Sequence, residues 1–207
     1  GNANLNSHMM KNSEWGAVAY LSRSEYGRTD EVWINNSSSY ITGSAGNSAS
    51  ASSNTGTTND YTSTQGVKAS TTGNVYGVYD MSGGAWEYVA AYVDNGNGNL
   101  TTYGNSLYTS TDAKTKNVYT KASTDNSANN YNQNAGKYGD AVYETSTSGN
   151  GTTSWYSDSS GFPYTDAPFF MRGGVSYDGS YAGVFYFYNG NGTGSSSDSF
   201  RPVLVAL

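Results

Sequence analysis

Hydrophobic residues recur with a helical period near the N-terminus. Between residues 12 and 27, Trp15, Val18 and Ala19 fall at positions i, i+3 and i+4, which places them on one face of a helix. Residues suited to the two ends of a helix flank this stripe: Ser13 as a cap, Glu14 in the first turn and Gly27 at the far end. The pattern predicts an amphipathic helix over residues 12–27.

A two-residue alternation follows in residues 74–93. If this stretch forms a strand, Trp86, Tyr88, Ala90 and Tyr92 lie on one face. Ala85, Glu87, Val89 and Val93 lie on the opposite face. The triplet Ser-Gly-Gly at 82–84 is typical of a tight turn. We therefore expect a turn leading into a strand that is apolar on both faces.

The last apolar pattern spans residues 172–204. It predicts a strand near residues 181–188, a glycine-rich turn and a closing strand over residues 200–205. Apolar residues form a firm frame in this segment: Val184, Phe185, Phe187, Phe200, Pro202, Val203 and Leu204. Between them stand Tyr, Ser, Asp, Asn and Gly with no helical or strand period. A frame filled with exchangeable polar residues needs an explanation.

Two long stretches lack periodicity. Residues 37–72 consist almost wholly of Ser, Thr, Asn, Gly and Ala, and residues 94–166 are polar with scattered tyrosines and Trp155. Such stretches are typical of surface loops, and we expect the aromatic residues to pin them to the domain. A flexible binding arm is the alternative for residues 37–72.

Aromatic residues change the expectation drawn from composition. Ile, Leu, Val and Phe are scarce, which would suggest disorder, but the net charge of the 207 residues is only −6. The chain has 20 Tyr, 6 Phe and 4 Trp, and each such ring buries a large area. We expect a single domain over residues 1–207 with a core rich in Tyr and Trp.

Charge and cysteine content narrow the function classes. With 13% charged residues and a sequence pI near 4.5, the chain has no basic stripe for nucleic acid. It has no cysteine, so disulfides and thiolate catalysis are excluded. No apolar run is long enough to span a bilayer and no signal peptide is recognisable. A targeting or anchoring segment would therefore precede residue 1.

Candidate catalytic chemistry is sparse. The single histidine, His8, lies in a polar stretch and is expected to be exposed and inert, so a Ser-His-Asp arrangement is not expected. Transition-metal sites need several His or Cys ligands. We expect no catalytic residue, no metal and no cofactor. Structural calcium, which needs only oxygen ligands, is the alternative, with the oxygen-bearing residues of one turn-rich region as candidates: Asp80, Glu87, Asp94 and Asn95.

Four stretches in one order resemble a known family. The segment "YGVYDMSGGAWEYV" (residues 76–89) resembles the signature of formylglycine-generating-enzyme-like (sulfatase-modifying factor) domains. "RGG" at 172–174, "SFRP" at 199–202 and the early "NSEWGAVAYLSRS" resemble further stretches of that family. The resemblance implies an α+β, C-type-lectin-like fold with few short helices, twisted antiparallel strands and long irregular loops.

Two departures separate the chain from the enzymes of that family. Those enzymes act through cysteines, which this chain lacks, so their oxidase activity is excluded. Gly84 also stands where the signature has the Asn linked to calcium. Within the same fold, Arg172 to Leu204 resembles the ending of the variable proteins of diversity-generating retroelements. In those proteins a frame is kept while selected codons are rewritten by adenine-directed mutagenesis.

This second resemblance implies a set of displayed, ligand-binding positions. They are Ser176, Tyr177, Asp178, Ser180, Tyr181, Tyr188, Asn189, Asn191, Ser195, Ser196, Ser197 and Asp198. Val175, Tyr186, Gly190 and Thr193 are weaker candidates for the same set. The chemistry suits recognition, because Tyr gives a large contact area with few rotors and Ser, Gly and Asn give adaptable hydrogen bonds.

The expected function is thus a non-enzymatic, ligand-binding protein on an extracellular bacterial surface or, alternatively, on a phage virion. Its C-terminal surface would recognise a macromolecule, protein or glycan, on another cell or host, as an adhesin or receptor-binding protein does. Membrane or pilus anchoring would use a segment outside this chain. Three alternatives stay open: a diverged enzyme of the formylglycine-generating type, a structural pilus or phage-tail subunit without its own ligand, and ordinary polar turns that close the domain.

Overall fold

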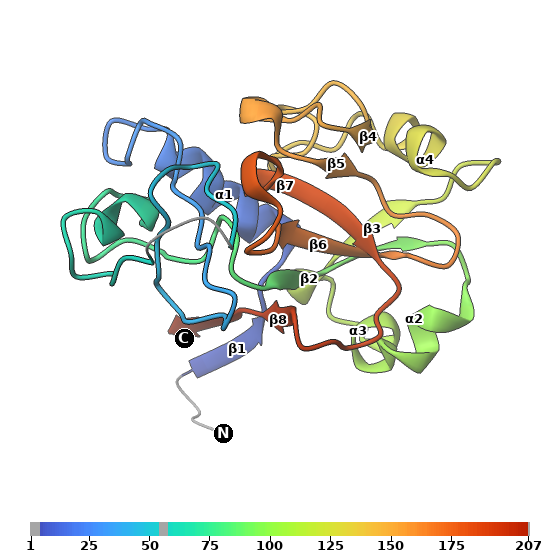
Figure 1. The fold of residues 1–207 in the computed structure, drawn as a ribbon. Coiled ribbons are helices and arrows are strands. Elements are labelled where there is room, and N and C mark those ends of the chain that lie inside the picture. Colours follow the sequence, from blue (N-terminus) through green and yellow to red (C-terminus); the bar gives the residue numbers. More distant parts are fainter. Residues whose placement is uncertain (1–4, 54–57, 207) are drawn as a thin grey trace.

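A computed structural model describes residues 5–53 and 58–206. These residues form a mixed α+β structure with few short helices and a curled sheet that contains both antiparallel and parallel pairs (Figure 1). The expectation of an α+β class with few short helices is confirmed. Among the described residues, no helix is long and apolar enough to cross a membrane.

Three strands form the middle of the sheet: β2 (Trp86–Asp94), β6 (Phe169–Gly173) and β7 (Gly183–Gly190). β6 lies between the other two and is antiparallel to both. The order across the sheet is β3-β2-β6-β7-β5-β4, and β8 pairs with the start of β2. The shorter strands are β3 (Asn117–Thr120), β4 (Asn150–Gly151), β5 (Ser160–Gly161) and β8 (Asp198–Phe200).

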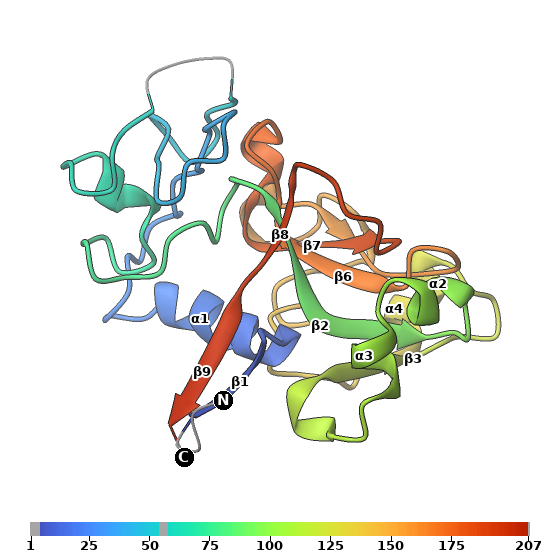
Figure 2. The same ribbon diagram turned by 90° about the horizontal axis from the view of Figure 1, so that it is seen from below.

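The helices are short and lie around the sheet. Among the described residues, four are α-helical: α1 (Asn12–Ser22), α2 (Gly98–Thr102), α3 (Asn105–Thr109) and α4 (Ser127–Gln133). Four are single 3₁₀ turns: η1 (Gly66–Ala69), η2 (Ala113–Thr115), η3 (Trp155–Ser157) and η4 (Gly179–Tyr181). Figure 2 shows α2 and α3 beside the end of β2, opposite the side on which α1 packs.

The predicted N-terminal helix is confirmed, but its ends differ from the expectation. α1 ends at Ser22, five residues before Gly27, and Lys11 rather than Ser13 is the N-cap. The Glu14 carboxylate accepts a 2.9 Å hydrogen bond from the Lys11 backbone N–H, which satisfies a donor that the helix leaves free. The Asn117 side chain accepts a 3.0 Å hydrogen bond from the Ser13 N–H, so a residue outside the helix satisfies a first-turn donor that a serine cap was expected to satisfy.

The two faces expected for β2 are also confirmed. Val89, Ala91 and Val93 point into the main hydrophobic cluster, whereas Tyr92 packs with Leu100 and Phe169 in a second, smaller cluster. A strand that buries both faces needs layers on both sides. α1 covers the first face, and α2 with α3 covers the second (Figure 2).

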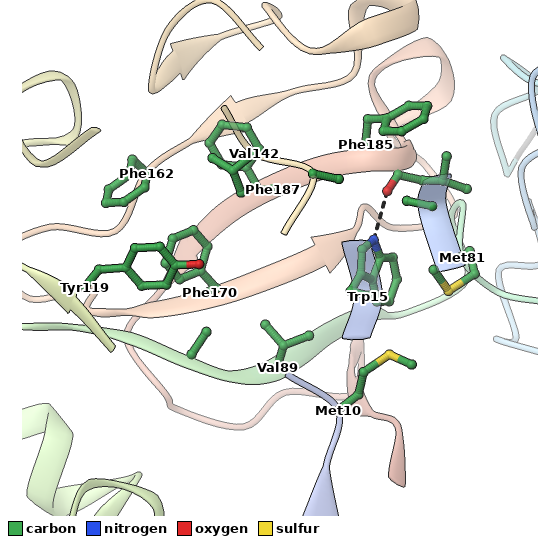
Figure 3. Close-up of a cluster of buried hydrophobic side chains, with 14 of the residues drawn as sticks. Met10, Trp15, Met81, Val89, Tyr119, Val142, Phe162, Phe170, Phe185 and Phe187 are labelled. Carbon is green, nitrogen blue, oxygen red and sulfur yellow. Dashed lines mark hydrogen bonds between the residues drawn. The ribbon is translucent and has the colours of Figure 1, made fainter. Parts of the chain in front are cut away.

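Aromatic rings make up much of the main cluster, but it holds four Phe, two Tyr and one Trp, so it is less rich in Tyr and Trp than the composition predicted. Figure 3 shows Trp15 from α1 and Phe170, Phe185 and Phe187 from β6 and β7 meeting over β2. The Trp15 indole donates a 2.8 Å hydrogen bond to the Val184 carbonyl, which ties α1 to β7. Buried indoles need such a partner, so this bond positions the helix as well as satisfying the N–H group.

The polar stretch 94–166 is more ordered than the sequence indicated. β3, β4, β5, α2, α3 and α4 lie within it, and Tyr119 and Tyr131 enter the main core beside Phe162. The expectation of irregular loops was wrong here because single apolar residues, spaced without a period, anchor several of the short elements: Tyr119 on β3, Tyr131 on α4 and Leu100 on α2. Residues 37–53 and 58–72 carry one 3₁₀ turn and otherwise no helix or strand, as expected. The four residues 54–57 of that stretch lie outside the described residues.

A fully buried arginine on β6 points to the side of the sheet that α1 covers. Arg172 on β6 donates hydrogen bonds of 3.3 Å to the Asn12 side chain and to the Asp140 carbonyl. Burial lowers the pKa of Arg172 to about 10, and the neighbouring Asp140 opposes that change. The "RGG" arginine is therefore a structural residue that joins β6 to α1 and to the loop at residue 140.

The closing strand lies outside the core. β9 (Pro202–Ala206) pairs antiparallel with β1 (Leu5–Met9) as a two-stranded ribbon, visible in Figure 2. Val184, Phe185 and Phe187 are buried as a frame requires, but Phe200 is 64% exposed and Leu204 67%. The expectation of one continuous frame was wrong for Phe200, Pro202 and Leu204. Pro202 and Leu204 lie on a two-stranded ribbon, which has no second layer on its outer face, and Phe200 lies on β8 in the wall of a hollow.

Candidate functional site on the C-terminal face

The displayed residues lie in the turn before η4, on η4, on β7, and from the loop after β7 to the start of β8. We call the surface formed by residues 176–181, 188–191 and 195–198 the C-terminal face. Tyr177, Tyr181 and Tyr188 are 52%, 54% and 40% exposed, respectively. Phe185 and Phe187 are fully buried next to them in the sequence. On β7, the residues from Gly183 to Phe187 are all buried, and Tyr188 is the first exposed side chain of the strand.

A tight turn after β6 brings η4 onto the face. Gly173 and Gly174 have φ of +82° and +76°, a conformation that L side chains rarely adopt. A Cβ on Gly174 would also lie 2.8 Å from the Cα of Ala182. The Asp178 carboxylate then accepts a 3.0 Å hydrogen bond from the Val175 N–H and closes the turn.

A row of aromatic side chains crosses the face. The rings of Tyr177 and Trp86 meet edge to face at 6.0 Å, and the Trp86 indole donates to the Tyr186 hydroxyl at 3.1 Å. The Tyr186 and Tyr188 rings follow at 5.9 Å. Sequence reasoning assigned Trp86 to a strand face and missed its place in this row. The one sequence feature that could have indicated this role is its position directly after the predicted turn, at the start of β2.

The loop from β7 to β8 is fastened to β2. The backbone N–H of Trp86 donates to the Ser197 carbonyl at 2.9 Å, and the backbone N–H of Gly192 donates to the Tyr88 hydroxyl at 3.2 Å. Within the loop, the Ser195 N–H donates to the Asp198 carboxylate at 2.9 Å. Backbone groups thus hold the loop while most of its side chains stay in solvent.

The structure sorts the expected positions by exposure. The exposed ones are Tyr177, Ser180, Tyr181, Tyr188, Asn191, Thr193, Ser195 and Ser196. The half-buried ones are Asp178, Asn189, Ser197 and Asp198. The buried ones are Ser176 and, among the weaker candidates, Val175, Tyr186 and Gly190.

Ser176 is the clearest departure from the expected display. Its N–H donates to the Gly84 carbonyl at 2.8 Å, and the residue is only 1% exposed. The expectation that its side chain is displayed was wrong. This hydrogen bond holds Ser176 against the loop that contains Gly84, and the side chain is buried there.

Two hollows lie beside β8. A polar one of about 360 Å³ separates β8 from the loop at residues 35–42, with Tyr40, Asp80 and Glu87 in its wall. An apolar one of about 540 Å³ lies on the other side, between Phe200, Leu107 and Phe169. Both volumes fall in the range of small-ligand pockets, roughly 300–1,000 Å³. Tyr40 comes from a stretch with no periodicity, so no sequence signal pointed to it.

Burial controls ionisation on the face. It raises the pKa of Asp178, against a hydrogen bond from Val175, and it raises the pKa of Tyr186. The pKa of Tyr177 also rises through desolvation and through the charge of Asp178. Because these shifts raise already high phenol pKa values, both hydroxyls stay protonated at neutral pH. They offer neutral donors and acceptors to a ligand.

The residues considered for calcium have other partners. The Asp80 carboxylate accepts hydrogen bonds from the Asn35 amide and from the Gly43 N–H, and Glu87 pairs with Arg201. Asp94 and Asn95 lie at the far end of β2. Within residues 5–53 and 58–206, no group of three or more His, Cys, Asp or Glu side chains could hold a metal ion.

The partner of His8 in the structure is Glu14. His8 is half-buried on β1, and its Nε2 lies 2.8 Å from the Glu14 carboxylate. The expectation that this histidine is exposed was wrong, because β1 lays it against the first turn of α1.

Comparison with known family models, with curated proteins and with solved structures gives no match.

Proposed function

We propose that the chain is a non-enzymatic ligand-binding protein that uses the C-terminal face to recognise a macromolecule on another cell or host surface. Its fold is of the C-type-lectin-like kind found in formylglycine-generating-enzyme-like domains. It functions as a variable protein of a diversity-generating retroelement, an adhesin or receptor-binding protein displayed on a bacterial surface.

One observation carries this proposal. Within residues 172–190, the residues of the motif's frame are buried, and three of the four tyrosines are exposed, while Tyr186 is buried. Arg172, Val184, Phe185 and Phe187 are 0–4% exposed, whereas Tyr177, Tyr181 and Tyr188 are each at least 40% exposed. A surface that must change its side chains without unfolding the protein needs this separation.

The physical chemistry of the face suits binding. Trp86, fixed by its hydrogen bond to Tyr186, supports Tyr177 from the side, so less rotamer entropy is lost when a ligand binds. Exposed tyrosines next to Ser and Asn form the adaptable surface that antibody loops also use. Tyrosine rings are the expected hot spots, and Asp178 and Asn189 orient the ligand.

Sequencing the 3′ end of this gene across many isolates tests the proposal. We expect changes confined to the displayed positions, matching adenines in a nearby template copy of the segment. The exposed positions should vary most and the buried Ser176 least. A uniform 3′ end without a template copy would contradict the proposal and leave a fixed domain with polar loops.

A further inference from the structure

A second aromatic surface lies beside η4, outside the segment 172–204. η3 packs against η4, and the Ser159 N–H donates to the Tyr181 carbonyl at 2.9 Å. On η3, Trp155 is 48% exposed and Tyr156 is 38% exposed. Two large rings are therefore held in solvent in a stretch for which the sequence indicated only a loop anchor.

The backbone that presents these rings is strained. Tyr156 and Ser157 are consecutive non-glycine residues with φ of +64° and +70°. A residue in this region costs of order 1–3 kcal/mol and persists only where its surroundings determine it, which is common at binding sites. The cost of two successive strained residues must be offset by favourable contacts elsewhere, and residues of the core make those contacts.

Phe185 and Asp158 hold the strained turn in place. The buried Phe185 ring meets Trp155 edge to face at 5.1 Å and stacks with Tyr156 at 6.2 Å. The Asp158 side chain is buried and accepts a 3.0 Å hydrogen bond from the Phe185 N–H. The two exposed rings therefore have rigid positions before any ligand arrives.

An arginine completes the hollow. The Arg23 guanidinium lies 5.3 Å from the centre of the Tyr156 ring, and Arg23, Trp155 and Tyr156 line an open hollow of about 370 Å³. Arg23 is exposed, and no described residue forms an ion pair or hydrogen bond with its guanidinium. A guanidinium stacked on a ring keeps its N–H edge free for a carboxylate.

We propose that Arg23, Trp155 and Tyr156 form a binding site for an acidic sugar, a pyranose ring that carries a carboxylate. The sugar ring stacks on the exposed Trp155 ring, and its carboxylate pairs with Arg23. Charge complementarity favours this occupant, because an unpaired cation beside aromatic rings in a chain of net charge −6 selects a single acidic group. The site goes beyond the proposed C-terminal face and does not depend on it.

NMR titration of the ¹⁵N-labelled protein tests this site. The probes are 3′-sialyllactose and a glucuronate-terminated disaccharide, with lactose as the neutral control. We expect one or both acidic probes to shift the indole N–H signal of Trp155 and the Arg23 amide. The indole signal of the buried Trp15 should stay unchanged, and lactose should bind at least about tenfold more weakly.

Variants separate the site from the C-terminal face. Arg23→Gln and Trp155→Ala should each weaken binding of the acidic probe by about tenfold or more. Lys121→Gln and Tyr76→Ala, at an exposed cation and a 93% exposed ring elsewhere, should leave it unchanged. Tyr188→Ala, on the C-terminal face, should leave it unchanged as well.

Three results would overturn the proposal. One is that neither acidic probe shifts the Trp155 signal at about 10 mM, a concentration at which even weak binding is detected. Another is equal binding of lactose. The third is equal binding of a tetraglutamate peptide, which would assign the hollow to acidic peptides instead. None of these outcomes bears on variation at the C-terminal face.

Discussion

The Arg201 guanidinium pairs with the Glu87 carboxylate, with 3.0 Å between Nε and Oε2. The pair joins the start of β2 to the segment between β8 and β9. Glu87 is only 5% exposed, and Arg201 also donates to the Tyr79 carbonyl at 3.0 Å. Two motifs more than a hundred residues apart are therefore connected beneath one wall of the polar hollow. This bond keeps β8, and with it one edge of the C-terminal face, against the sheet.

Breaking this pair should destabilise the protein. Arg201→Met leaves the Glu87 carboxylate buried without a partner, and we expect the free energy of unfolding to fall by about 3 kcal/mol in urea titrations. The double variant Arg201→Met with Glu87→Gln should recover part of that loss, since no charge is then left buried. An equal loss in Lys121→Met, an exposed control, would contradict this account.

Glycine at position 183 should be required by close packing. A Cβ there would lie 2.0 Å from the Asp158 carboxylate, so Gly183→Ala forces that buried group to move. We expect a loss of about 1–3 kcal/mol in the free energy of unfolding. Gly194→Ala is the matched control, because nothing lies within 4 Å of the Cβ it would add. Similar losses in the two variants would show that close packing is not the cause.

The pH dependence of stability should contain a contribution from Asp158. Burial raises its pKa well above the usual value, and Glu31 adds to this, while the Phe185 N–H and Arg172 oppose it. The folded state therefore holds the proton more tightly than the unfolded state. This contribution is fully present below the unfolded pKa, about 4, and is lost as pH rises through the folded pKa.

Asp158→Asn removes that titration while the side chain can still accept from Phe185. We expect the difference in unfolding free energy, variant minus wild type, to increase as pH rises above about 4. Urea titrations from acid to neutral pH measure it. A difference that is independent of pH would contradict the raised pKa.

The C-terminal face should tolerate substitution where the frame does not. The triple change Tyr177→Ser, Tyr181→Asn and Tyr188→Asn should alter the free energy of unfolding by no more than about 1 kcal/mol, since exposed side chains contribute little. It should also abolish binding to any ligand of the face. Phe185→Ala should cost about 3–5 kcal/mol, because the ring is fully buried. Thermal or urea unfolding of the two variants, measured side by side, compares the costs.

Trp15 should be needed for both its ring and its N–H group. Trp15→Phe leaves a cavity and leaves the Val184 carbonyl without its donor, and we expect a loss of about 2–3 kcal/mol. Trp155→Phe, at a 48% exposed ring, is the control and should cost less than about 1 kcal/mol. Equal losses of unfolding free energy at the two positions would contradict a stabilising role for the Trp15 ring and its hydrogen bond to β7.

The sequence by itself determined the elements whose periodicity is strong. Trp15 and Ala19 on α1 and the two faces of β2 follow from the spacing of apolar residues. That spacing is a local property, because the side-chain direction repeats with the backbone geometry. The division of residues 183–190 into core and displayed positions does not follow this period, because Tyr186 is buried between Phe185 and Phe187. It was predicted from the resemblance instead.

Tertiary structure alone decided which surfaces are covered. Tyr119 and Tyr131 entered the core without any periodic signal, because distant rings such as Phe162 pack on them. Ser176 became buried through a backbone bond to Gly84, and Leu204 stayed exposed because β9 pairs only with β1. Arg23 and Trp155, 132 positions apart, line one hollow with Tyr156. Contacts between segments so far apart depend on how the elements pack, which no local pattern records.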